Sequence, residues 1–66
     1  MAVAKVIEIT AASDQSFEDA IGRGIAKASE TVRNIQGAWI KEQQVKVTDG
    51  GISEFRVDLK VTFLLD

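Results

Sequence analysis

The sequence predicts an α+β protein of β-α-β-β order, with a three-stranded antiparallel sheet (order 1-3-2) packed on one amphipathic helix. Three observations predict this fold: a short β-branched segment, a following stretch of apolar residues at helical spacing, and two strand-like segments joined by a tight-turn motif. A helix between the first two strands lets them run parallel, and the last strand can then insert antiparallel between them.

The first strand is expected over residues 3–10, which are short and rich in β-branched side chains. Two helix starts follow it. Ser13 could be the N-cap, or Ser16 could be the N-cap with Asp19 completing a capping box. Both alternatives place acidic residues at the positive end of the helix dipole.

A stripe of apolar residues at spacings of three and four predicts the helix. The stripe consists of Phe17, Ile21, Ile25, Ala28, Val32 and Ile35. Gly37 follows it and is expected to end the helix in the left-handed conformation. On the opposite face, Asp19 and Arg23 are four residues apart and can form an ion pair. Such a helix would be about 33 Å long, which matches the last strand and would cover it fully.

Residues 38–47 indicate the second strand, with a bulge near Gln43 where the apolar alternation changes parity. Asp49-Gly50-Gly51 is a strong hairpin signal because tight turns need residues that tolerate positive φ. Residues 55–63 then alternate apolar and polar side chains and predict a strand with one buried and one wet face. The resulting sheet has one bare face and two open edges.

Composition excludes several classes of function. The 66 residues include 8 basic and 10 acidic side chains, a net charge of -2, and no cysteine, histidine or proline. A disulfide framework, a zinc finger, a Cys/His nucleophile and an imidazole base are therefore excluded, and any metal would need oxygen ligands. Because Glu18 and Asp19 are adjacent on a solvated helix face and no isolated acid lies in an apolar stretch, we predict that the protein is not an enzyme.

The same numbers constrain the partners. A pI near 5.0 with mixed charges argues against a nucleic-acid partner, since phosphate-tracking surfaces are basic. No apolar run approaches the roughly 20 residues of a membrane span, and no signal peptide is recognisable. We therefore expect one cytoplasmic domain over residues 1–66. A chain this small buries only about 60% of its surface, so without disulfides a homo-oligomer is expected.

Four residues are candidates for a special role. Gly22 and Gly24 lie within the predicted helix, lack the third glycine of a dinucleotide motif, and are better explained by close packing of another backbone or subunit. Trp39, the single tryptophan, is either a core residue or a platform for a planar ligand or a subunit. Arg56 lies on the strand face that the helix does not cover, where it is solvated, stacks on a ring or pairs with a phosphate.

Taken together, six segments make the whole chain resemble the dodecin family. They are Lys5-Val6-Ile7-Glu8-Ile9, the helix start from Ser13 to Ala20 with Phe17, Thr31-Val32-Arg33-Asn34-Ile35, Lys41-Glu42-Gln43, Asp49-Gly50 and residues 54–63. The resemblance implies a homododecamer, a hollow shell of cubic symmetry built from β-α-β-β protomers. Flavin-binding members hold the flavin, often as stacked pairs, between a tryptophan after the helix and a glutamine on the last strand. The implied activity is storage or quenching of flavin.

At these two positions the sequence departs from the flavin-binding pattern, because the tryptophan position falls on Gly37 and the glutamine position on Arg56. Trp39 is two residues further on and shares the face of residue 37 in an extended strand, about 6.5 to 7 Å away. We therefore expect FMN or another flavin at a site formed by Gly37, Trp39 and Arg56. The alternative is a dodecin-like cage without flavin that binds another small ligand or calcium, or that serves assembly alone.

Overall fold

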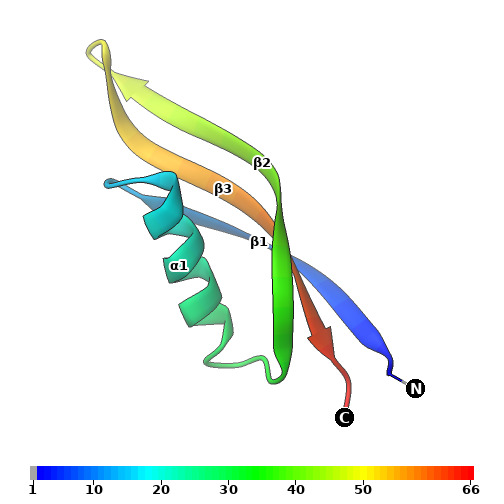
Figure 1. Cartoon of the computed structure of the whole chain (residues 1–66). Helices are drawn as coiled ribbons and strands as arrows, with labels where there is room; N and C mark the ends of the chain where they lie inside the picture. Colours follow the sequence, from blue (N-terminus) through cyan, green and yellow to red (C-terminus); the bar gives the residue numbers. More distant parts are fainter. Residues whose placement is uncertain (1) are drawn as a thin grey trace.

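The computed structural model describes residues 2–66 and has the predicted β-α-β-β order (Figure 1). Its elements are β1 (Ala4–Ser13), α1 (Phe17–Ala28), β2 (Ile35–Thr48) and β3 (Gly51–Leu64). The sheet order is β1-β3-β2, and β3 pairs antiparallel with both neighbours, so the predicted topology is confirmed. Each strand is longer than expected, and β2 and β3 extend to the turn that joins them.

The core lies between α1 and the central strand β3. Val57, Leu59 and Val61 on β3 are almost fully buried, together with Ala20 of the helix. These strand residues belong to the predicted apolar face, which is confirmed. Gly24 is also buried, and a Cβ added there would lie 3.0 Å from the Cβ of Ala11 on β1. The predicted close approach at a helix glycine is therefore real for Gly24, whereas a Cβ at Gly22 would meet nothing within 4 Å in the protomer.

The helix ends much earlier than the apolar stripe predicted. It stops at Ala28, and the Ser29 hydroxyl bonds the carbonyl of Ile25 at 2.8 Å. The left-handed residue before β2 is Asn34, with φ of 64°, while Gly37 lies within the strand. The stripe was misleading because its last residue, Ile35, packs on the same core from the start of β2. The spacing of apolar residues indicates which residues pack on the core. The same spacing can continue after the helix has ended and the chain has reversed direction.

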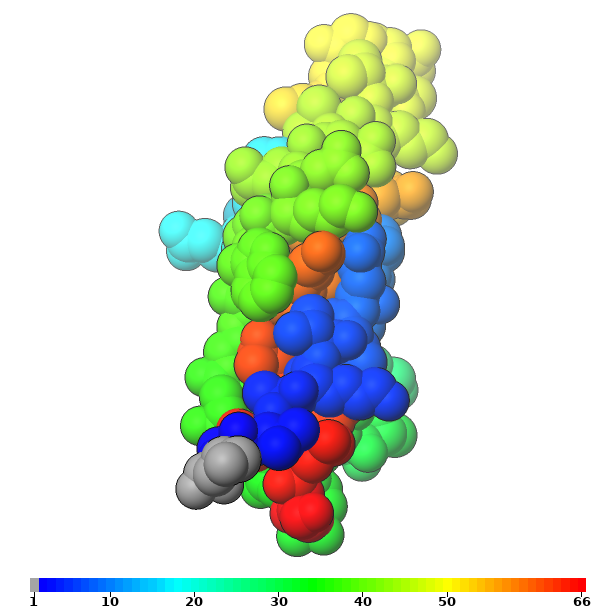
Figure 2. Space-filling view, turned by 90° about the vertical axis from the view of Figure 1, so that its right-hand side faces the viewer, coloured from blue at the N-terminus to red at the C-terminus, as the bar shows by residue number. Residues whose placement is uncertain are grey.

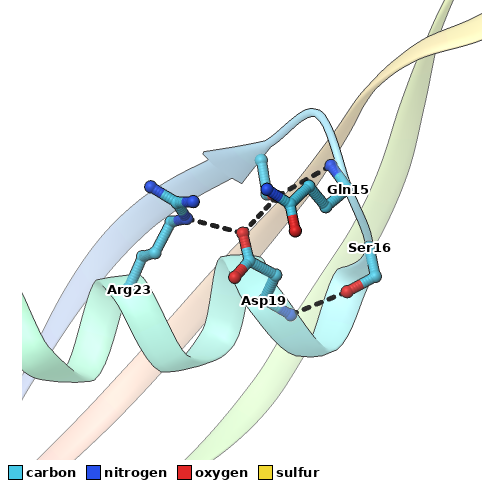
Figure 3. A network of polar contacts seen from close by, with 5 residues as sticks. Gln15, Ser16, Asp19 and Arg23 are labelled. Carbon is cyan, nitrogen blue, oxygen red and sulfur yellow. Dashed lines mark hydrogen bonds and ion pairs between the residues drawn. The ribbon is translucent and has the colours of Figure 1, made fainter.

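The helix start confirms the second of the two predicted alternatives. Ser16 is the N-cap, and its hydroxyl accepts a 2.9 Å hydrogen bond from the backbone N–H of Asp19 (Figure 3). The Asp19 carboxylate does not complete the capping box. It accepts hydrogen bonds from the Ser13 hydroxyl and from Nε of Arg23, both at 2.5 Å, which confirms the predicted Asp19–Arg23 pair and ties α1 to the end of β1.

The β2–β3 hairpin has a tight turn and irregular pairing. Asp49 and Gly50 have φ of 52° and 79°, as the two-residue turn requires, so this prediction is confirmed. The predicted bulge near Gln43 lies two residues earlier, because Ile40 pairs with Leu59 and Glu42 with Asp58, which leaves Lys41 as the extra residue. A second irregularity between Lys46 and Val47 places an extra residue on β3.

The helix covers only part of the sheet. Its 12 residues span about 18 Å, whereas the molecule is 51 Å long, so the predicted match between helix and last strand is wrong. The outer part of the hairpin extends past α1 in Figure 1 and exposes Val45, Val47 and Ile52. Over residues 2–66, no helix is long and apolar enough to cross a membrane.

Candidate functional site

The face of the sheet opposite α1, here called the open face, carries all three candidate site residues. Figure 2 views this face, with β3 running between β2 in green and β1 in blue. The pairing register arranges its side chains in rows that cross the sheet. The row containing Trp39 consists of Glu8 on β1, Lys60 on β3 and Trp39 on β2.

Trp39 is a surface residue in the protomer. It is the fifth residue of β2 and lies eleven residues after the helix end, not beside it as expected. Trp39 is 50% exposed, so it is not a core residue of the protomer. The Lys60 ammonium lies over the ring, with Nζ 5.8 Å from the centroid, inside the range of a cation–π contact. The ring is therefore accessible and has a lysine ammonium beside it.

Gly37 lies in the adjacent row, opposite Thr62, on the same face as Trp39. The predicted sharing of one face by residues 37 and 39 is therefore confirmed. A Cβ added at Gly37 would meet nothing within 4 Å, so the space beside the indole ring is empty of protein atoms in the protomer. Its φ is not in the left-handed region, so other residues would fit the backbone there. The pair forms a flat platform with an adjoining free surface.

Charged side chains of both signs surround this platform, among them Glu8, Lys41 and Lys60. Lys41 reaches across the open face to Glu8, with Nζ 3.4 Å from the carboxylate. The bulge makes this contact possible, because it leaves Lys41 unpaired on β2 while Glu42 continues the ladder. Glu8 is thus neutralised by Lys41, and within residues 2–66 Lys60 has no ion pair.

Arg56 lies on the predicted face but away from Trp39. It pairs with Ala12 on β1 and Gln44 on β2, four residues along β3 from Lys60, which corresponds to about 14 Å. Its guanidinium bonds the Glu54 carboxylate at 2.7 Å. Arg56 therefore borders a separate shallow hollow near the hairpin arm, and one protomer does not bring it beside the indole ring.

Two acids face each other between these positions. Glu42 and Asp58 are directly opposite on β2 and β3, and Asp58 accepts a 3.0 Å hydrogen bond from the Thr10 hydroxyl. Across the described part of the chain, no group of three or more histidine, cysteine, aspartate and glutamate side chains is arranged to hold a metal ion. A metal held by carboxylates alone would thus need ligands from more than one subunit.

Lys60 is the site residue that sequence reasoning missed, since it was read only as one of the polar alternates of the last strand. Trp39 precedes the Asp49-Gly50 turn by the same number of residues as Lys60 follows it, and the two residues are paired across the strands. The pairing keeps this simple register because β3 has one extra residue opposite Lys46–Val47 and β2 has one extra residue, Lys41, so the two register shifts cancel. The hairpin turn was therefore the signal that could have found the pair.

Comparisons with known proteins show the family to which the whole chain is similar. The family model described as Dodecin matches residues 3–66. The chain is 31% identical to the dodecin of Thermus thermophilus over 64 residues, which cover 97% of this chain and 93% of that protein. It is 35% identical to the calcium dodecin of Mycobacterium tuberculosis over 63 residues, covering 96% and 89% respectively.

Two solved structures illustrate the likeness in three dimensions. The dodecin from Streptomyces davaonensis superposes with a TM-score of 0.94 at 32% identity, covering 98% of this chain and 96% of that one. The crystal structure of the M. tuberculosis calcium dodecin, a calcium-chelating antigen with a novel calcium-binding site, gives a TM-score of 0.83 at 34% identity. That superposition covers 97% of this chain and 91% of the mycobacterial one.

Proposed function

Since the chain belongs to the dodecin family, we propose that it assembles into a homododecamer that binds FMN or a related flavin for storage or protection, without catalytic turnover. The uncovered sheet face and the exposed apolar residues of the outer β2–β3 hairpin (Val45, Val47 and Ile52) support an assembly, because a monomer would leave them in water. The cytoplasm is the expected location of this store.

The observation that carries the flavin proposal is the half-exposed Trp39 on the open face, beside the empty space at Gly37. An exposed indole offers a flat surface on which an isoalloxazine ring can stack, and aromatic pairs contribute about 0.5–1.5 kcal/mol beyond the area they bury. Trp39 would therefore serve as the platform, shifted by two residues from the position that the family resemblance implies.

The proposed role of Arg56 depends on assembly. At about 14 Å from the Trp39 row along β3, its guanidinium would contact a flavin held mainly by another subunit, or the far end of a long ligand. Binding of the ligand would then need the assembled protein, and dissociated protomers would bind flavin weakly.

Titration of flavin fluorescence tests the proposal. We expect the wild-type protein to quench FMN and riboflavin, and Trp39→Ala to weaken binding by about tenfold, the equivalent of 1.4 kcal/mol of lost stacking. Ile40→Ala is the matched control, because Ile40 is the next residue of β2, is 38% exposed and faces the other side of the sheet. Both variants must keep the mass of the wild-type assembly.

Equal loss of binding in the two variants would contradict a specific platform at Trp39. If the wild-type protein binds no flavin, Gly37→Trp becomes informative, because it installs an indole at the family position without a clash in the protomer. Flavin binding by that variant alone would mean that the cage geometry persists and that Trp39 does not replace the missing tryptophan.

Calcium binding is the second candidate, because the M. tuberculosis relative carries calcium in its name. In this chain the Glu42–Asp58 pair would supply the oxygen ligands, joined by groups from neighbouring subunits. Calorimetric titration of the chelator-treated assembly with Ca²⁺ distinguishes the two functions. Saturable binding that Glu42→Gln abolishes, with flavin left unbound, would favour calcium.

A further inference from the structure

The turn between β2 and β3 joins two residues that can react with each other. Asp49 is followed by Gly50, and both are exposed. The carboxyl carbon of an aspartate lies within reach of the next backbone nitrogen, and closure of a five-membered cyclic imide joins the two. A side chain on the next residue hinders this attack, and glycine has none. Asp14, Asp19 and Asp58 precede glutamine, alanine and leucine, so among these aspartates Asp49 is the one with an unhindered neighbour.

Neither reacting group is held by hydrogen bonds. The register pairs Thr48 with Gly51, so the Gly50 N–H lies between the paired residues and makes no backbone hydrogen bond within residues 2–66. In the same part of the chain the Asp49 carboxylate makes no ion pair and no side-chain hydrogen bond. The hydroxyls of Thr48 and Ser53 bond each other at 3.0 Å instead.

The turn can open without disturbing the core. Phe17 at the start of α1 packs edge-on against Phe55, with ring centroids 5.2 Å apart, and the hairpin extends beyond that end of the helix in Figure 1. Val47 and Ile52, next to the turn, are 61% and 55% exposed. Segments with few buried contacts open locally at low free-energy cost. Opening matters because the closed turn holds Asp49 left-handed, with φ of 52°, and the planar imide needs a different rotation of its Cα–C bond.

From these observations we propose that Asp49-Gly50 is a site of spontaneous backbone isomerisation, at which Asp49 becomes isoaspartate and the end of the β2–β3 hairpin comes apart. In the first step the Gly50 nitrogen bonds to Cγ of Asp49, and the carboxyl hydroxyl leaves as water with the N–H proton. In the second step water adds to the main-chain carbonyl carbon of Asp49, and the bond from that carbon to the Gly50 nitrogen breaks. The main chain then runs through Cβ and Cγ, and the mass is unchanged.

The new linkage is incompatible with the two-residue turn. Such a turn matches the twist of its strands only when both central residues have positive φ, and an extra main-chain carbon removes that match. The Thr48–Gly51 and Val47–Ile52 pairs should therefore separate, while the Val45–Phe55 pair and those beyond it stay joined. The inference concerns the turn alone and does not depend on the ligand of the open face.

Peptide mapping of the aged wild-type assembly tests the proposal. The protein is kept in mildly acidic buffer below its unfolding temperature, because a neutral carboxyl group loses its hydroxyl more readily than a carboxylate. Electron-transfer fragmentation then measures isoaspartate at each position. Asp14, Asp19 and Asp58 are internal controls, and the last two also accept hydrogen bonds from Ser13 and Thr10. We expect Asp49 to react at least about tenfold faster than any of them, which corresponds to a barrier lower by about 1.4 kcal/mol.

Two variants and one further measurement sharpen the test. Asp49→Glu keeps the charge but must close a six-membered ring, so no isomerisation is expected. Asp49→Asn suits the positive φ and loses ammonia more readily than aspartate loses water, so it should react faster, with the mass change of deamidation. In the aged wild type, hydrogen exchange should accelerate only at the amides of residues 47–52.

Isoaspartate that forms no faster at Asp49 than at Asp14, or equal ageing of Asp49→Glu, would overturn the proposal. Reaction of the wild type only after unfolding in denaturant would overturn it as well, because the folded assembly would then keep the turn closed. Unchanged hydrogen exchange in isomerised protein would overturn the separation of the hairpin end.

Discussion

Replacement of Gly24 by alanine tests the closest approach between helix and sheet. The added Cβ would lie 3.0 Å from the Cβ of Ala11, 3.1 Å from Cδ1 of Leu59 and 3.6 Å from Cδ1 of Ile9. The Leu59 and Ile9 methyl groups can turn away, but the Ala11 Cβ is fixed to the β1 backbone. The helix must therefore move by a few tenths of an ångström from a core that is already filled.

The expected magnitude is a difference of two opposing effects. Overpacking of this kind costs about 1–3 kcal/mol, and alanine in place of glycine within a helix returns up to about 1 kcal/mol. We expect Gly24→Ala to lower the free energy of unfolding by about 1–2 kcal/mol. Gly22→Ala receives the same gain in helix propensity without a neighbour within 4 Å and should be neutral or stabilising by up to about 1 kcal/mol.

Denaturant-induced unfolding, followed by circular dichroism, measures both variants against the wild type. All three proteins must be compared at one protomer concentration, because association contributes to the apparent stability. An unchanged midpoint for Gly24→Ala would refute the close helix–sheet contact. Destabilisation by Gly22→Ala as large as that by Gly24→Ala would mean that another subunit packs on the outer glycine.

Three further substitutions test other parts of the structure. Leu59→Ala should cost about 3 kcal/mol in thermal or denaturant unfolding, because the side chain is fully buried and leaves a cavity. Gly50→Ala should cost about 1 kcal/mol in the same measurement, since its φ of 79° is unfavourable for a residue with a Cβ. Hydrogen bonds from Ser13 and then Arg23 lower the pKa of Asp19 below its ordinary value of 3.8, so its contribution to stability is complete above pH 3.8 and is lost as the pH falls through the lower folded value. Unfolding midpoints measured against pH should therefore show a weaker acid dependence in Asp19→Asn, and an unchanged dependence would contradict these contacts.

The order of elements could be predicted because each has a local cause. The strict alternation of β3, the Asp49-Gly50 turn and the Ser16 cap act over a few residues, and all three are present in the structure. The end of the helix could not be predicted in this way. Val32 and Ile35 continue the helical spacing, and only the left-handed Asn34, a residue type that tolerates positive φ, marks the reversal.

The sequence predicted the relative positions of candidate site residues only when they lie on the same strand. Gly37 and Trp39 share a face because side chains alternate along a strand, and that part needed no partner strand. Trp39 and Lys60 meet through the cross-strand register, which bulges on both strands modify. The separation of Arg56 from Trp39 likewise depends on the register, and the expected single cluster of three residues is absent from the protomer.

The most direct test of a flavin-binding dodecamer is size-exclusion chromatography with light scattering and a full absorbance spectrum across the peak, with and without FMN. The predicted result is a mass near twelve times the 7.2 kDa protomer, with flavin absorbance that co-elutes with the protein. The same mass without retained flavin would contradict the binding function, and a monomer would contradict the assembly as well.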